Sequence, residues 1–152
     1  MKGIILSGGL GSRLNPITTG ISKQLIPIYD KPMVYYSLTT LMNLGIRDIL
    51  IISSKEYINL YKNLFSNFKN IGIDIDFKVQ NKPNGIAEAF LIAERFIQND
   101  NIALILGDNI FYGIDELNIK KQIKKNIFPS IFCYKVSNPS RYGVLKFKKD
   151  KV

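Results

Sequence analysis

The residues best suited to chemistry lie at the first turn of the chain. An apolar run over residues 3–6 breaks into a loop that holds Gly8, Gly9 and Gly11. Glycine amides are not shielded by a Cβ, so successive N–H groups can face one concavity and hold an anion. Arg13 follows the loop with a planar, permanently charged group that suits a phosphate. The loop therefore predicts a phosphate-binding site, with an ordinary strand-to-turn connection as the alternative.

This loop matches neither of the two common glycine fingerprints of nucleotide-binding proteins. The pattern G-x-G-x-x-G needs a residue between its first two glycines, whereas Gly8 and Gly9 are adjacent. The Walker pattern needs Gly-Lys followed by Ser or Thr, whereas Gly11 is followed by Ser12 and Arg13. The sequence therefore indicates a third kind of phosphate loop.

Two further side chains complete a candidate charged site. Lys23 follows a surface segment with a proline, which we expect to return it toward the glycine loop, where it would clamp a polyphosphate with Arg13. Asp108 comes almost directly after an apolar run over residues 101–106. A carboxylate facing a phosphate would repel it unless a divalent cation lay between them, and Mg²⁺ is the natural bridge. The alternatives are a surface lysine and a turn aspartate.

Strand and helix patterns alternate along the chain, which predicts an α/β fold with a mostly parallel sheet. Apolar runs and alternating patterns predict strands over residues 3–6, 48–52, 74–79, 101–106, 130–135 and 143–147, the 74–79 strand nearer a sheet edge. Amphipathic spacing predicts helices over residues 32–44, 53–65 and 86–96. The helix from residue 53 is expected to open with a capping box over Ser53–Glu56. Ligands of such sheets bind beyond the carboxyl ends of the strands, where both the glycine loop and Asp108 fall.

The composition favours one domain over residues 1–152 and restricts the chemistry. A length of 152 residues with 46% hydrophobic content is enough for a core, and no stretch is apolar for long enough to span a membrane. The sequence holds no histidine. That absence removes the usual general base and His-ligated metals, and leaves carboxylates, lysines and backbone groups for any catalysis.

Charge and cysteine content predict partners and compartment. A net charge of +9 invites a nucleic-acid interpretation, but lysine accounts for most of the basic residues, whereas nucleic-acid surfaces favour arginine. We therefore expect solvated lysine faces and no nucleic-acid partner. The chain starts without a recognisable secretion signal, and its single cysteine, Cys133, lies in an apolar run. We expect a cytoplasmic protein in which Cys133 is a small buried hydrophobe.

Three ordered motifs closely resemble those of the sugar-1-phosphate nucleotidyltransferases, and the resemblance covers essentially the whole chain. They are residues 8–18, 22–33 and 106–111. The resemblance implies a Rossmann-like α/β fold with helices on both faces of the sheet. It also implies Mg²⁺-dependent transfer of a thymidylyl group from dTTP to α-D-glucose 1-phosphate, giving dTDP-glucose and pyrophosphate on the way to dTDP-rhamnose. The in-line attack of the sugar phosphate on the α-phosphorus needs positioning and charge neutralisation rather than a base.

The same resemblance implies roles for individual residues. Arg13, Lys23 and Asp108 would be catalytic, and Asp108 would also bind Mg²⁺. The nucleotide-binding positions would be Leu6, Gly8, Gly9, Gly11, Ser12, Arg13, Lys23, Gln80 and Gly85. Within that set, the Gln80 side chain and the Gly85 backbone match the pair that reads the thymine edge. The sugar side would be lined by Asn109, Tyr142 and Gly143.

The sequence departs from the family pattern in two respects. Ser7 stands where family members commonly carry alanine. Family members also run to nearly twice this length, and the chain stops before the Glu-Glu-Lys-Pro segment that holds the sugar phosphate and before a second metal-binding aspartate. We therefore expect the nucleotide-binding portion of a nucleotidyltransferase domain, incomplete at its C-terminus.

Other functions stay open at this point. Uridylyl or cytidylyl transfer within the same family would differ in the base that Gln80 reads. A nucleotide-binding module without turnover is the alternative outside enzymology. The resemblance also implies a homo-oligomer, a tetramer, for the full-length parent.

Overall fold

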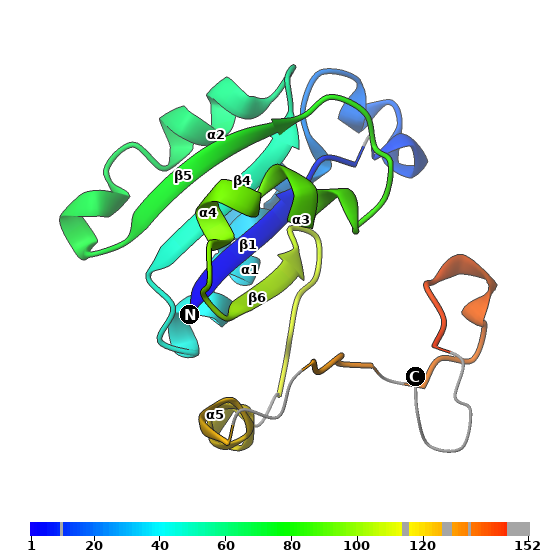
Figure 1. The fold of residues 1–152 in the computed structure, drawn as a ribbon. Coiled ribbons are helices and arrows are strands. Elements are labelled where there is room, and N and C mark those ends of the chain that lie inside the picture. The colour runs from blue at the N-terminus through cyan, green and yellow to red at the C-terminus, as the bar shows by residue number, and fades with distance from the viewer. Residues whose placement is uncertain (10, 114–115, 126–128, 134, 146–152) are drawn as a thin grey trace. The chain divides into compact units, whose positions relative to one another are not determined.

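A computed structural model describes residues 1–9, 11–113, 116–125, 129–133 and 135–145 (Figure 1). The chain divides into two compact units, Met1–Lys120 and Lys121–Val152. Among the described residues, no helix has the length and apolar character needed to cross a membrane.

The first unit is built on a four-stranded sheet in the order β5-β4-β1-β6. All of its strand pairs are parallel, with Gly3 of the central β1 opposite Ile49 on one side and Ala103 on the other. The strands are β1 (Lys2–Ser7), β4 (Asp48–Ser54), β5 (Asp74–Gln80) and β6 (Ile102–Leu106). This confirms the predicted α/β class, the strands near residues 3–6, 48–52, 74–79 and 101–106, and the edge position of β5.

Helices cover both faces of this sheet (Figure 1). They are α1 (Met33–Asn43), α2 (Ile58–Leu64), α3 (Glu88–Ile92) and α4 (Glu94–Ile97). Successive residues of a strand point to opposite faces, so Ile5 packs in one core cluster with residues of α1 and α2, while Ile4 packs in another with Ala89 and Ala93. The central strands therefore need apolar residues at every position, which explains their continuous apolar runs.

Short elements connect β1 to α1 and carry the chain out and back over the carboxyl end of the sheet. They are the 3₁₀ turns η1 (Ser12–Leu14), η2 (Ile17–Thr19) and η3 (Lys23–Leu25), and the two-residue strands β2 (Pro27–Ile28) and β3 (Lys31–Pro32). The turn η4 (Phe68–Ile71) precedes β5. Prolines at several of these positions limit longer helices or strands, so a segment of short turns is the expected result.

Two predicted helices differ from the structure. The helix expected over residues 86–96 is divided at Ala93, which ends α3 and precedes α4. The capping box over Ser53–Glu56 is wrong, because β4 continues to Ser54 and α2 begins only at Ile58. The Ser53 hydroxyl donates instead to the Ser7 carbonyl oxygen on the neighbouring strand, at 3.3 Å. The Ser53 side chain therefore bonds to a neighbouring strand, whereas the local sequence pattern predicted that it caps a helix.

The described residues of the second unit do not form the strands predicted over residues 130–135 and 143–147. Residues 130–133, 135 and 143–145 have no strand structure, while residues 134, 146 and 147 lie outside the described residues. A strand requires a ladder with a neighbouring strand, so an apolar run alone does not make one. Cys133 is exposed, which makes its predicted burial wrong. The described residues after β6 also form the helix α5 (Glu116–Lys124) and the 3₁₀ turn η5 (Pro139–Arg141).

Candidate nucleotide site

A cavity of about 300 Å³ lies at the carboxyl ends of β1 and β6. It is lined by Gly9, Gly11, Ser12, Arg13, Leu14, Lys23, Gln24 and Asp108. The structure therefore brings most of the residues predicted for phosphate and metal binding into one place, from three segments of the sequence. Cationic side chains and glycine amides around a concavity are the donors that a polyphosphate needs.

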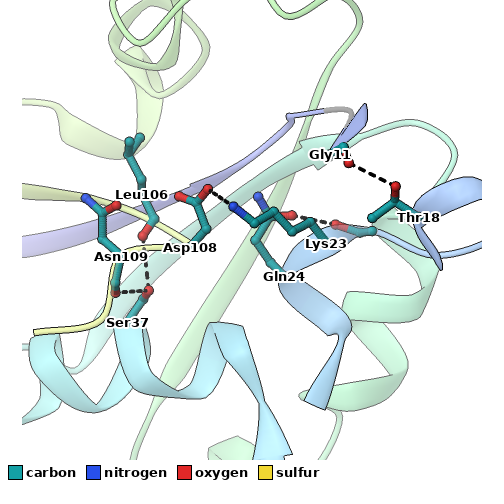
Figure 2. Close-up of polar contacts among 9 residues, drawn as sticks. Gly11, Thr18, Lys23, Gln24, Ser37, Leu106, Asp108 and Asn109 are labelled. Carbon is teal, nitrogen blue, oxygen red and sulfur yellow. Dashed lines mark hydrogen bonds and ion pairs between the residues drawn. The ribbon is translucent and has the colours of Figure 1, made fainter. Parts of the chain in front are cut away.

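The glycine loop requires glycine at positions 8 and 11 for different reasons. Gly11 has a φ of +62°, in the left-handed region, and a Cβ there would lie 3.0 Å from Lys23 Cβ and 3.0 Å from Thr18 Cγ2. A Cβ on Gly8 would overlap Gln80 Oε1. The Thr18 hydroxyl, 2.9 Å from the Gly11 carbonyl oxygen, ties the loop to η2 (Figure 2).

Lys23 and Asp108 form an ion pair across the cavity. Lys23 Nζ lies 2.9 Å from Asp108 Oδ2, and each side chain is 30% exposed (Figure 2). Lys23 is held by the turn η3, and Asp108 by the end of β6, where the Ser37 hydroxyl of α1 lies 3.0 Å from the Leu106 oxygen and 3.2 Å from the Asn109 oxygen. Lys23 also lines the cavity together with Gly9 and Gly11, which confirms the prediction that the proline-containing segment returns Lys23 toward the glycine loop.

The structure adds Gln24, a cavity residue that the sequence analysis did not identify. Gln24 is 4% exposed, and its Oε1 accepts a hydrogen bond of 2.7 Å from the Ser22 hydroxyl. Ser22 has only one hydroxyl hydrogen, so the Tyr61 hydroxyl, 2.9 Å away, must be the donor to Ser22. Burial raises the pKa of Tyr61 above its ordinary value of 10.0, which keeps this phenol protonated and able to donate.

The hydrogen bond from Ser22 also shows how the Gln24 amide is oriented. With its oxygen turned toward Ser22, the Gln24 amide nitrogen faces the other way and is available as a donor. The signal in the sequence was a glutamine beside Lys23, but only the structure shows that it is buried and lines the cavity.

A second polar group lies beside the first glycine of the loop. Gln80 ends β5 and is 4% exposed, with its Oε1 against Gly8. Its Nε2 donates to Glu88 Oε2 at 2.6 Å, and Asn84 Nδ2 donates to Glu88 Oε1 at 3.1 Å. The hydrogen bond from Gln80 lowers the pKa of Glu88 below its ordinary value. Glu88 is a second residue that the sequence analysis did not single out.

The remaining predicted residues have different surroundings. Leu6 is buried, and its carbonyl oxygen accepts a 2.9 Å hydrogen bond from the Gly107 amide, which joins β1 to the turn before Asp108. Gly85 lies in the loop between β5 and α3 with a φ of +103° and is not among the residues that line the cavity. Asn109 is exposed and follows Asp108. Tyr142 and Gly143 are exposed residues of the second unit.

Few of the described side chains in this region could act as ligands of a metal ion. Among the described residues, no group of three or more histidine, cysteine, aspartate and glutamate side chains is placed to hold one. Of the residues that the structure describes, Asp108 is the one that contributes a carboxylate to the cavity lining. This fits Mg²⁺, which commonly uses one or two protein carboxylates and takes its other ligands from phosphates and water.

The family model described as nucleotidyl transferase matches residues 2–152. The chain belongs to this nucleotidyl transferase family. Similar curated proteins include the glucose-1-phosphate thymidylyltransferase of Neisseria meningitidis, 51% identical over 151 residues, which are 99% of this chain and 52% of that protein. The glucose-1-phosphate thymidylyltransferase of Mycobacterium tuberculosis is 49% identical over 147 residues, 97% of this chain and 51% of that protein.

Solved structures of nucleotidyl transferases have the same fold. A Bacillus anthracis protein described as a glucose-1-phosphate thymidylyltransferase, in complex with sucrose, matches with a TM-score of 0.76 and 38% identity, over 83% of this chain and 51% of that one. A UDP-glucose pyrophosphorylase complexed with UDP-glucose matches with a TM-score of 0.68 and 25% identity, over 82% and 53%. The chain spans about half the length of the curated relatives it matches. The Rossmann-like nucleotidyltransferase fold predicted from the sequence is confirmed.

Proposed function

We propose that this chain forms the nucleotide-binding part of an enzyme that transfers a thymidylyl group from dTTP to α-D-glucose 1-phosphate. The products would be dTDP-glucose and pyrophosphate, with dTDP-glucose leading on to dTDP-rhamnose. The names of the similar proteins support the substrates. The observation that carries the proposal is the single cavity in which the glycine loop, Arg13, Lys23 and Asp108 meet.

The geometry supports in-line phosphoryl chemistry that depends on charge and position. Gly9 and Gly11 would offer backbone amides to the triphosphate, and Arg13 would stabilise the departing pyrophosphate. Lys23 would exchange its ion pair with Asp108 for the nucleotide phosphates. The sugar phosphate is already ionised at neutral pH, so no residue has to remove a proton, which agrees with a sequence without histidine.

Mg²⁺ is part of this proposal, with Asp108 as the residue of this chain that would hold it. When bound, the ion would neutralise phosphate charge next to a carboxylate that otherwise repels it. We expect Mg²⁺ to tighten dTTP binding to the unsubstituted chain and to do so much less in Asp108→Asn. Asp76→Asn, an exposed aspartate on β5, is the matched control. If Asp108→Asn keeps the full effect of Mg²⁺, Asp108 is not the ligand.

The site assignment is tested by thermal unfolding with Mg²⁺ and each of dTTP, UTP, CTP, ATP and GTP. A ligand at 100 times its dissociation constant stabilises a folded site by about 2.7 kcal/mol, which shifts the midpoint measurably. We expect the largest shift for dTTP, its loss in Arg13→Ala, and its retention in Arg95→Ala, a matched exposed arginine on α4. A transition that responds to no nucleotide would overturn the site, and glucose 1-phosphate-dependent pyrophosphate release would distinguish turnover from binding alone.

Uridylyl transfer is the second candidate within the family. It is favoured by the structural match to a UDP-glucose pyrophosphorylase complexed with UDP-glucose. A midpoint shift that is larger for UTP than for dTTP would select it.

A further inference from the structure

A polar contact outside the cavity lining sets the direction of one amide group. Both carboxylate oxygens of Glu88 accept hydrogen bonds, Oε2 from Gln80 Nε2 at 2.6 Å and Oε1 from Asn84 Nδ2 at 3.1 Å. Glu88 is the first residue of α3, and Gln80 is the last of β5, so the contact joins the two ends of one connection.

The chemistry of the partner determines which end of the Gln80 amide faces it. An ionised carboxylate has no hydrogen to donate, so the amide NH₂ must point toward Glu88 and the amide oxygen must point away. The structure shows this arrangement, since Gln80 Oε1 lies where a Cβ on Gly8 would stand. The lowered pKa of Glu88 favours the ionised form and therefore maintains the arrangement at neutral pH.

An amide oxygen that is held next to the glycine loop can distinguish pyrimidine bases that carry a hydrogen on N3 from those that do not. Thymine and uracil carry N3–H, which can donate to an amide oxygen. Cytosine has a lone pair at N3, so a carbonyl oxygen that faces N3 is repelled by cytosine and accepts a hydrogen bond from thymine or uracil. Gln80 is 4% exposed, so little water is available to relieve a mismatch between two acceptors.

We propose that Glu88 is a positioning residue that holds the Gln80 amide oxygen toward the nucleotide and so selects pyrimidine bases with a hydrogen on N3. This inference rests on the proposed function and on the base-reading role that the family resemblance implies for Gln80. Glu88 acts through Gln80 and does not itself touch the nucleotide.

The test is the ratio of the dissociation constants of dCTP and dUTP, which differ only at the base edge in question. In Glu88→Gln, the new amide can donate as well as accept, so Gln80 can turn over without losing its partner. We expect this ratio to fall about tenfold or more, in line with the discrimination that such base-edge hydrogen bonds provide. A role in folding alone would weaken both nucleotides equally and leave the ratio unchanged. Glu94→Gln, an exposed glutamate at the start of α4, is the matched control and should keep the ratio.

A second pair of variants separates this inference from the proposed function. Glu88→Ala removes the carboxylate and should also lower the ratio, while Gln80→Ala should abolish most of the discrimination. If Gln80→Ala lowers the ratio but both Glu88 variants keep it, the positioning role is overturned and the base-reading role of Gln80 stands. If Gln80→Ala keeps the ratio, or the chain binds neither nucleotide, the base-reading assignment fails and the inference fails with it.

Discussion

At the scale of single residues, the glycines near the site have different structural roles. Gly8 leaves space for the Gln80 side chain, and Gly11 adopts a left-handed backbone between Lys23 and Thr18. Gly9 meets neither requirement, because its Cβ would have no atom within 4 Å. It lines the cavity, so its missing side chain leaves room for a ligand instead. One short run of glycines thus combines packing, backbone conformation and access.

We predict that Gly11→Ala destabilises the fold and weakens nucleotide binding, whereas Gly20→Ala does neither. A left-handed conformation costs a non-glycine residue about 1–2 kcal/mol, and the added Cβ would also press on Lys23. Gly20 has a φ of −114° and open space around its Cβ, so alanine fits there without strain. Denaturant unfolding and dTTP titration of both variants measure the difference. Equal stability of the two variants would show that the loop conformation is not under this constraint.

At the scale of elements, the site depends on how α1 and α2 hold the connecting turns. Tyr61 of α2 is completely buried and donates through Ser22 to Gln24, which links a core helix to the wall of the cavity. On the other side, Ser37 of α1 holds the turn that carries Asp108. The cavity is therefore supported by the two helices that also pack the core, and its geometry is coupled to core packing.

We predict that Tyr61→Phe lowers the free energy of unfolding by about 1–2 kcal/mol, because the Ser22 hydroxyl loses its donor in a buried environment. The same change frees Ser22 and Gln24 to reorient, so dTTP affinity should fall as well. Tyr29→Phe is the control, since Tyr29 is 97% exposed and its hydroxyl is hydrated in both states. The measurement is denaturant unfolding at neutral pH, followed by dTTP titration. If Tyr61→Phe retains full stability, the hydroxyl chain does not support the wall.

Sequence patterns predicted the elements whose positions follow from continuous burial and missed those that depend on a partner. β1 and β4 were identifiable because both faces of each strand are covered, which forces apolar residues throughout. Ser53 could not be assigned from its neighbours, because its hydrogen-bond partner lies on another strand. The apolar run that contains Cys133 was misread for the same reason, since apolar character does not create a ladder partner.

The residues of the candidate site also divide into those that the sequence predicts and those that depend on a distant partner. A glycine loop, a cation and a carboxylate carry their chemistry in their residue types, and parallel-sheet topology brought them to one end. Gln24 and Glu88 act through hydrogen bonds to side chains elsewhere in the fold, so their positions became apparent only in three dimensions.

At the scale of the whole first unit, the sheet has two well-protected central strands and two edges. β1 pairs on both sides, and its Ile4 and Ile5 are completely buried, as are Ile49–Ile52 of β4. Among the described strands β5 pairs only with β4, and every second residue along most of its length is exposed. Within the part of the chain that the structure describes, β6 pairs only with β1. The candidate site therefore joins a buried central strand of the sheet to an edge strand.

Amide hydrogen exchange should reveal this gradient and its response to ligand. We predict the slowest exchange in β1 and β4, whose amides need the largest opening, and faster exchange in β5 and β6, which can open locally. Adding Mg²⁺ and dTTP should slow exchange in η1, η3 and the turn after β6, because a bound triphosphate would hold these three cavity walls together. GTP at the same concentration is the control for binding without base recognition. If β6 exchanges as slowly as β1 without ligand, a further segment covers its outer edge, and if dTTP slows only the β5–α3 loop, the phosphates are not bound in the cavity proposed for them.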